Sequence, residues 1–255
     1  MIASRRLHHV FLPHAGGAGA DLLGIAKTLC EAPNRHLLEL PGRGRRRREP
    51  LVHDCAIALD DLDARLKARF AATDLTGNTP VLFLGHSFGA YMAWMLARRH
   101  SARHPFAPVV VVALSNRPLH IRRRFHVPHG VSRARDAALF SELVAFVETL
   151  GNIPEVIRAT PNLFERFMAV LAADLAVADG LPWDLAALQA PLPLITGHGE
   201  TDPVCQIDQD RWAQLGTGPH FHFTLPGGHF LPMDSTAALA RILTGSDIYR
   251  RWAVS

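Results

Sequence analysis

One segment constrains the fold more than any other: the sequence VLFLGHSFG at residues 81–89. Its apolar first half predicts a buried strand, and the unbroken apolar stretch after Gly89 predicts a helix. Between them lies a G-x-S-x-G pattern, in which the serine occupies a sharp strand-to-helix turn. Such a turn strains the backbone and projects the hydroxyl of Ser87 beyond the sheet. The pattern is short enough to occur by chance, but the flanking strand and helix supply the required context. We therefore predict that Ser87 is a nucleophile.

Apolar strands alternate with helical segments along the rest of the chain. We expect strands at His8–Pro13, His36–Leu40, Val81–Gly85, Val109–Leu114, Leu192–Thr196 and His220–Leu225, and helices at Leu22–Leu29, Val52–Phe70, Ala90–Arg99 and Ser235–Leu243. The β-branched run at residues 109–114 is typical of a central parallel strand. In the helix at 52–70, the spacing places Ile57 and the leucines inward and Asp60, Asp61 and Asp63 outward. The alternation predicts an α/β fold with a mostly parallel central sheet flanked by helices.

The segment at residues 116–184 interrupts this alternation. Three helices are expected in it, at Asp136–Leu150, Pro154–Thr160 and Pro161–Ala178, with no strand between them. They could be ordinary crossover helices, but three in succession are more than one crossover needs. We predict a helical lid at 116–184, inserted into a core formed by residues 1–115 and 185–255. Such insertions often select and enclose a substrate.

Two later loops carry partners for the serine. Asp202 follows the strand at 192–196, and His229 follows the strand at 220–225. The chain order Ser87, Asp202, His229 is the order of the catalytic triad in an α/β-hydrolase fold. A serine hydroxyl needs a base such as His229, and Asp202 would accept the other ring N–H and fix the tautomer. Glu200 is the nearest rival for the acid.

The glycine-rich loop HAGGAG at residues 14–19 has a place in the same chemistry. It lacks G-x-G-x-x-G, which argues against a dinucleotide site. In a hydrolase of this kind, such a loop supplies one backbone N–H of the oxyanion hole, and the residue after the nucleophile supplies the other. We assign these N–H groups to Ala15 and Phe88, with Gly16 as the alternative if the loop register differs. Pocket residues are expected at His14, Gly16, His86 and Phe230, with His86 in a supporting role.

Composition narrows the remaining possibilities. The net charge of +4 is compatible with an acidic partner. The arginine run of residues 43–48 lacks the aromatic platforms of a nucleic-acid module, and we interpret Arg46 to Arg48 as a solvated loop. Three scattered cysteines suit a reducing cytoplasm and show no metal spacing. His220 and His222 lack an evident third ligand, so no metal site is predicted. We expect no signal peptide, no membrane span and a monomer.

With these residues placed, the chain resembles the type II thioesterases that accompany nonribosomal peptide and polyketide synthases. The resemblance covers nearly the whole chain and is carried by the sequences PHAGG at 13–17, LPGRGRR at 40–46, GHSFG at 85–89, GNIPEV at 151–156, DPV at 202–204 and PGGHFL at 226–231. The chain departs from the family pattern at Phe88, where methionine is commoner, and at two places late in the lid. These are AADL at 172–175, where the family often has an Arg-Ala-Asp-Phe-like run, and LPW at 181–183, where a tyrosine is common.

The resemblance implies a hydrolase that removes acyl groups from the phosphopantetheine arm of acyl or peptidyl carrier proteins, with no metal or soluble cofactor. A general small-molecule esterase or lipase of the same fold is the alternative enzyme. A non-catalytic binding protein is a further alternative, which the filled triad positions disfavour.

Overall fold

A computed structural model describes residues 7–73, 78–128, 135–151, 153–205 and 209–253. Among these residues, six strands form one parallel sheet in the order β2-β1-β3-β4-β5-β6. The strands are β1 (His8–Leu12), β2 (Arg35–Leu37), β3 (Val81–His86), β4 (Val109–Leu114), β5 (Leu194–Gly199) and β6 (His220–Leu225). Every residue of β1, β3 and β4 is buried, as expected for parallel strands covered on both faces.

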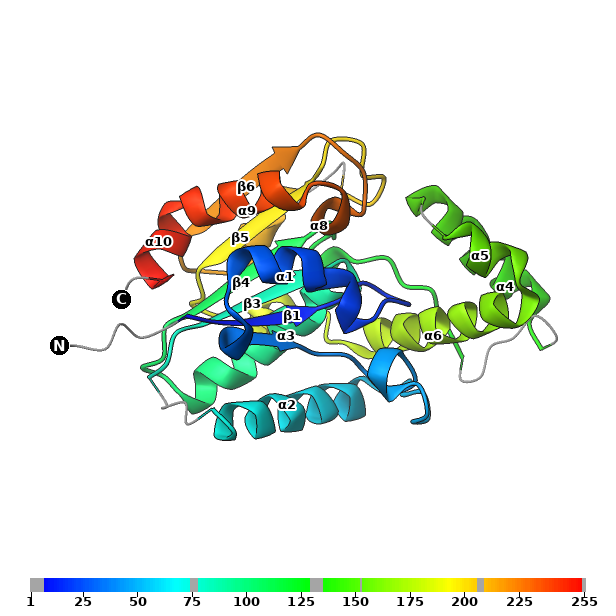
Figure 1. Ribbon diagram of the computed structural model, residues 1–255, viewed down its shortest axis with the longest axis horizontal. Coiled ribbons are helices and arrows are strands. Elements are labelled where there is room, and N and C mark those ends of the chain that lie inside the picture. Colours follow the sequence, from blue (N-terminus) through cyan, green and yellow to red (C-terminus); the bar gives the residue numbers. More distant parts are fainter. Residues whose placement is uncertain (1–6, 74–77, 129–134, 152, 206–208, 254–255) are drawn as a thin grey trace.

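Helices cover both faces of the sheet (Figure 1). One face carries α2 (Cys55–Ala71) and α3 (Phe88–Arg103), and the other carries α1 (Leu23–Leu29), α9 (Thr236–Gly245) and α10 (Asp247–Ala253). Short helices are α5 (Glu155–Ala159), α7 (Leu185–Leu188), α8 (Leu231–Asp234) and the 3-10 turns at Gly19–Leu22, Ala32–Asn34, Gly44–Arg46, Leu119–Ile121 and Gln209–Gln214. Alternate residues of a strand face opposite sides, so Val10 and Leu12 join one core and Phe11 the other.

A third apolar core lies in the segment between β4 and β5. It joins α4 (Ala137–Leu150) and α6 (Pro161–Gly180), and Phe140, Leu143 and Leu171 are among its buried members. In Figure 1 these helices lie at the right, beyond the carboxyl ends of the strands. The carboxyl-terminal end of α6 reaches the sheet, because Val177 and Ala178 belong to the core under α2 and α3. Helix α6 thus contributes to the core of the lid segment and to the core under α2 and α3. The lid boundaries at 116 and 184 stay a prediction.

Three expectations about side chains were wrong. Ile57 is 59% exposed, although its spacing predicted an inward position. Asp63 is buried because Arg103 of α3 donates to both of its carboxylate oxygens, at 2.5 and 2.6 Å, and Lys67 lies 2.9 Å away. Arg46 is also buried instead of solvated, since it pairs with Glu49 and Asp61. For Asp63 and Arg46, oppositely charged partners that the fold brings close account for the burial.

Several element bounds also differ from the sequence-based expectation. The expected start of α2 moves from Val52 to Cys55, where the Asp54 side chain accepts the N–H groups of Ala56 and Ile57 and caps the helix. A further helix, α10, follows the one expected at Ser235–Leu243 and was not predicted. No helix in the described part of the chain has the length and apolar character to cross a membrane.

Candidate active site

The turn between β3 and α3 holds Ser87 in a strained conformation. Its φ of 53° and ψ of −120° lie outside the regions that L residues normally occupy. Glycine is required on both sides because the elements almost touch. A Cβ atom on Gly85 would lie 2.0 Å from the carbonyl oxygen of Gly89, and one on Gly89 would lie 2.1 Å from that of Leu12. These contacts press the start of α3 against β1 and hold Ser87 at the carboxyl edge of the sheet.

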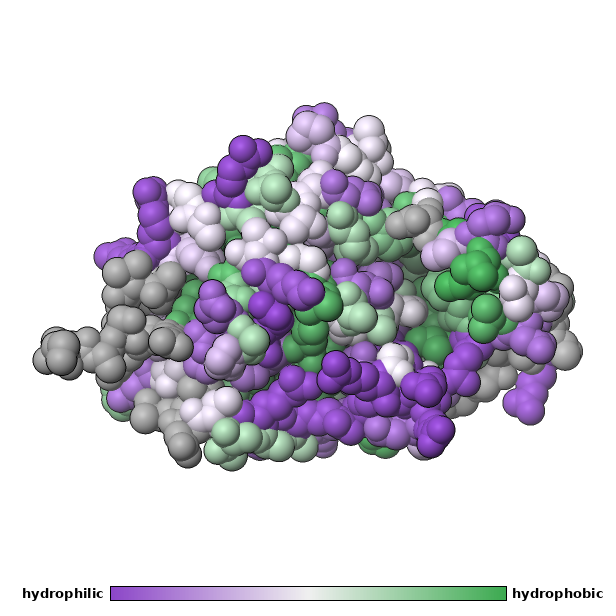
Figure 2. Space-filling model, in the orientation of Figure 1, coloured by the Kyte–Doolittle hydropathy of each residue, from purple (hydrophilic) through white to green (hydrophobic). Residues whose placement is uncertain are grey.

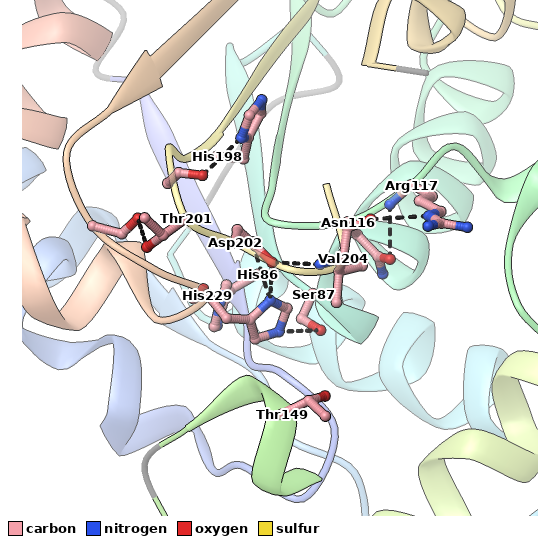
Figure 3. Close-up of polar contacts among 12 residues, drawn as sticks. His86, Ser87, Asn116, Arg117, Thr149, His198, Thr201, Asp202, Val204 and His229 are labelled. Atoms are coloured by element: carbon pink, nitrogen blue, oxygen red, sulfur yellow. Dashed lines mark hydrogen bonds and ion pairs between the residues drawn. The ribbon is translucent and has the colours of Figure 1, made fainter. Parts of the chain in front are cut away.

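Ser87, His229 and Asp202 form a connected hydrogen-bonded set, although they come from three separate loops (Figure 3). The Nε2 atom of His229 lies 3.0 Å from the Oγ atom of Ser87. Its Nδ1 atom lies 3.0 and 3.1 Å from the two carboxylate oxygens of Asp202. Since an ionised carboxylate only accepts, Nδ1 carries the proton in the neutral ring and Nε2 is free to accept from the serine. This is the arrangement that activates a serine hydroxyl.

The buried carboxylate of Asp202 is stabilised in its charged form. Its side chain is inaccessible to solvent. Burial is the largest influence and by itself raises the pKa, but the hydrogen bond and charge of His229 and the N–H of Val204 together lower the pKa of Asp202 below its ordinary value. The Val204 N–H donates to Oδ1 at 2.9 Å. Asp202 therefore stays ionised at neutral pH and can stabilise a protonated His229 during reaction. Glu200, the rival acid, has an exposed side chain and no contact with His229 among the interactions of the described residues.

The backbone N–H groups near Ser87 distinguish the two candidates for the oxyanion hole in the opening loop. The Gly16 N–H donates to Oδ2 of Asp174 at 2.8 Å, so this donor is already used. Within the described residues, no protein acceptor takes the N–H of Ala15 or of Phe88. Both residues line the same cavity as Ser87. The geometry thus favours Ala15 and Phe88 as the two donors, and their role in stabilising an oxyanion stays a prediction.

A buried ion pair holds Gly16 in place. Asp174 of α6 also accepts from both terminal nitrogens of Arg43, whose Nη2 lies 2.6 Å from Oδ1. The side chains of Asp174 and Arg43 are 0% and 4% exposed. The carboxylate therefore joins the opening loop, the segment after β2 and the lid helix at one point. Sequence reasoning noted Arg43 and Asp174 only as parts of two separate motifs and missed this contact.

Three aromatic side chains pack around the base. The Nε2 atom of His86 lies 2.7 Å from the backbone oxygen of His229, and since a carbonyl only accepts, His86 is protonated at Nε2. Burial, and then the charges of His14 and His229, hold the pKa of His86 well below its usual range. Burial similarly lowers the pKa of His14 to about 3. The ring of Phe230 contacts both histidines edge-on. A neutral His86 thus anchors the backbone of His229 and does not compete as a base.

The triad opens into one cavity of about 770 Å³. The volume is within the range of small-molecule sites. The sheet side contributes His14, Ala15, Gly16, Ser87, Phe88, His229 and Phe230, and the lid contributes mainly apolar side chains, among them Phe146, Val147, Leu150, Ile157, Phe167 and Leu171. Figure 3 shows Thr149 of α4 on the lid side of the triad. Of the four expected pocket residues, His14, Gly16 and Phe230 line this cavity and His86 does not.

A further residue supports the acid loop and was missed from sequence. The Nε atom of Arg117, just after β4, donates to the carbonyl of Val204 at 2.9 Å. This bond fixes the loop in which the Val204 N–H donates to Asp202. No local pattern marks Arg117, since its partner lies 87 positions later. Among the described residues, no group of three or more His, Cys, Asp or Glu side chains is placed to hold a metal ion.

Comparisons with known proteins agree with this site. A family model described as a thioesterase domain matches residues 9–246. The human medium-chain S-acyl fatty acid synthase thioesterase is 23% identical over 229 residues, which are 88% of this chain and 80% of the relative. A probable cadicidin biosynthesis thioesterase of Streptomyces griseus is 26% identical over 224 residues, 87% of this chain and 57% of the relative.

A solved structure extends the similarity to the fold. YbtT, a type II thioesterase from the yersiniabactin NRPS/PKS biosynthetic pathway, superimposes with a TM-score of 0.74. The match covers 100% of this chain and 96% of YbtT at 21% identity. The shared fold confirms the expected α/β-hydrolase architecture. Because the family model spans nearly the whole chain, including the segments that carry Ser87, Asp202 and His229, this protein belongs to the thioesterase domain family.

Proposed function

We propose that this chain is a type II, or editing, thioesterase that hydrolyses acyl thioesters on the phosphopantetheine arm of carrier proteins. The observation that carries the proposal is the hydrogen-bonded Ser87–His229–Asp202 set at the base of a cavity whose lid side is apolar. An apolar cavity accepts an acyl chain, and the triad meets the carbonyl at its end. The similarity to YbtT, a type II thioesterase of a biosynthetic pathway, and to the biosynthesis thioesterase of Streptomyces griseus supports the same assignment.

The mechanism follows from the geometry. His229 Nε2 removes the proton of the Ser87 hydroxyl while Oγ attacks the thioester carbonyl. The N–H groups of Ala15 and Phe88 would stabilise the resulting oxyanion, each by about 3–4 kcal/mol. Collapse of this intermediate breaks the carbon–sulfur bond, and the imidazolium returns its proton to the departing thiolate. Water then attacks the acyl-serine with His229 as base, which releases the acid and restores Ser87.

This proposal needs no metal or soluble cofactor, since side chains and backbone supply the nucleophile, base and oxyanion donors. We further infer a cytoplasmic monomer. The thiols of Cys30, Cys55 and Cys205 are free, which suits a reducing compartment. A dimer mass in light scattering would contradict the monomer, and an intermolecular or intramolecular disulfide in protein from the native cell would contradict the compartment.

The test compares acyl groups on a carrier protein with the same groups on free pantetheine, for the wild type and Ser87→Ala. We expect a higher kcat/KM on the carrier-bound substrate, and a loss of roughly a millionfold in kcat in the variant, as for other serine hydrolases that lose the nucleophile. A Ser246→Ala variant is the matched control, because its hydroxyl is also buried but donates to the carbonyl of Leu243 between α9 and α10, and Ser246 does not line the cavity.

Other outcomes select the alternatives. Equal turnover of carrier-bound and free substrates, with simple oxygen esters cleaved as well, would favour a general esterase. Failure of a serine-reactive fluorophosphonate to label Ser87 would favour a non-catalytic binding protein. Labelling without turnover of acetyl groups would contradict broad editing activity and direct the search to longer acyl chains.

A further inference from the structure

In the segment before α2, three arginines have no carboxylate partner among the described residues. Of its arginines, Arg43 is paired with Asp174, and Arg46 donates to Glu49, Asp61 and the carbonyl of Glu39. Arg45, Arg47 and Arg48 are exposed, and no carboxylate in the described part of the chain pairs with their side chains. The paired arginines are structural, so the exposed ones project from a fixed backbone and not from a loose loop.

The nearby carboxylates are already engaged, which leaves the surface positive. Glu49 and Asp61 bind Arg46, and Glu39 accepts the backbone N–H groups of Gly19 and Arg45 at 3.0 and 2.8 Å. The next helix adds cations. Burial, and then the charges of Arg65 and Arg45, lower the pKa of Arg69. Figure 2 shows the resulting hydrophilic band over the region of α2 and the segment before it.

This basic surface borders the entrance of the thioester cavity. Arg47 lines the cavity and is also exposed to solvent. Arg166 of α6 lines the cavity as well and donates to the carbonyls of Gly42 and Arg47, at 3.3 and 2.6 Å. One turn before it, Leu163 also lines the cavity and is 45% exposed. We name Arg45, Arg47, Arg48 and Arg166 the arginine rim.

A substrate tethered to another protein imposes a condition on such a rim. The thioester must reach Ser87 while the body of the carrier stays outside, so the carrier's surface must rest on the residues around the opening. A rim with unpaired arginines favours a negatively charged surface there, and an exposed leucine at the same edge offers an apolar contact for it.

We propose that the arginine rim, with Leu163, is the docking surface for an acidic face of the carrier protein. This inference rests on the proposed function. Long-range attraction between the rim and the carrier raises the rate of encounter, and it falls as salt screens the charges. The rim acts on carrier-bound substrate only, because free acyl-pantetheine has no protein surface to rest on it.

The test uses Arg45→Glu/Arg48→Glu, two rim residues that do not contact Ser87, His229 or Asp202. For acyl-carrier protein we expect kcat/KM to fall by about tenfold or more, the lower end of what electrostatic steering contributes. For the matching acyl-pantetheine we expect no change, which also shows that the variant is folded. The wild type should lose carrier turnover steeply between low and high salt, and the variant should lose much less.

Two control variants sharpen the result. Arg241→Glu/Arg250→Glu makes the same change in net charge on α9 and α10, away from the cavity, and should leave both substrates unaffected. Arg45→Lys/Arg48→Lys keeps the charge and should retain carrier turnover.

Each remaining outcome overturns the proposal in a distinguishable way. Unchanged carrier turnover in the charge-reversal variant, while the wild type still prefers carrier-bound substrate, would refute the rim and leave the proposed function intact. A wild type with no preference for the carrier would refute the proposed function itself. Salt-sensitive binding of duplex DNA that the charge reversal abolishes, with carrier turnover unchanged, would assign the rim to nucleic acid.

Discussion

The contact of Asp174 with both Arg43 and the opening loop makes a quantitative prediction. In Asp174→Asn the side chain keeps its size and one acceptor oxygen, but the guanidinium of Arg43 stays buried without a compensating charge. Removing one partner of a buried ion pair costs about 3–5 kcal/mol. For a domain of this size, that corresponds to a decrease in Tm of roughly 6 to 20 °C. Urea unfolding and thermal melting measure the loss.

The same substitution should also slow the reaction. Asp174 fixes the N–H of Gly16, and the adjacent N–H of Ala15 is the expected oxyanion donor. Loss of one such donor lowers kcat by about 10²–10³-fold, so a loosened loop should lower kcat by a factor up to that range. Because the donor acts on the transition state more than on the bound substrate, kcat should fall and KM should change little. Acyl-pantetheine hydrolysis, measured below the Tm of the variant, separates the loss of activity from the loss of stability.

Asp179→Asn is the matched control on the same helix. Asp179 is also buried, and its carboxylate accepts the N–H groups of Phe125 and Val127 at 3.0 and 3.1 Å, away from the opening loop. It should lose stability and keep its kcat. If both variants lose kcat by the same factor, or if Asp174→Asn keeps the wild-type kcat, the reasoning about the opening loop is wrong.

Three more predictions concern stability, pH and substrate length. Arg46→Met should lower the free energy of unfolding by about 2 kcal/mol, since it removes buried charge-assisted hydrogen bonds. Arg48→Met, at an exposed position, should change it by less than about 0.5 kcal/mol. Equal urea midpoints for the two variants would contradict this prediction. Burial lowers the pKa of His9 to about 4 and of His36 to about 3, so the unfolded chain binds more protons below pH 6.5. Stability should therefore be complete above pH 6.5 and fall as the pH decreases toward 4, and a urea midpoint at pH 5 equal to that at pH 7 would refute it. Phe167→Ala enlarges the lid side of the cavity and should raise the ratio of kcat/KM for long acyl chains to kcat/KM for short ones by about tenfold. An unchanged ratio would mean that the acyl chain of the substrate does not lie beside Phe167.

The sequence determined those features that are encoded within short segments. The strand at residues 109–114 and the strand at 220–225 have the predicted bounds, because continuous or alternating apolar residues identify strands locally. Ser87, Asp202 and His229 could be found because each lies in its own strand-end loop and their order along the chain is informative. The structure then adds the distances that join them, and it favours Ala15 over Gly16, an alternative that the sequence left open.

Only the tertiary structure decided which charged side chains are buried and what they join. Asp63 was expected in solvent because helical periodicity describes one helix, and its burial depends on Arg103 of a neighbouring helix. Arg43 and Asp174 lie 131 positions apart, and nothing in either segment specifies the other as its partner. A carboxylate in isolation is most stable in water, and it becomes a structural element only where the fold supplies a cation and N–H donors around it. Such compensation is a property of the assembled fold, so the link between the lid helix and the expected oxyanion loop could not be predicted from the sequence.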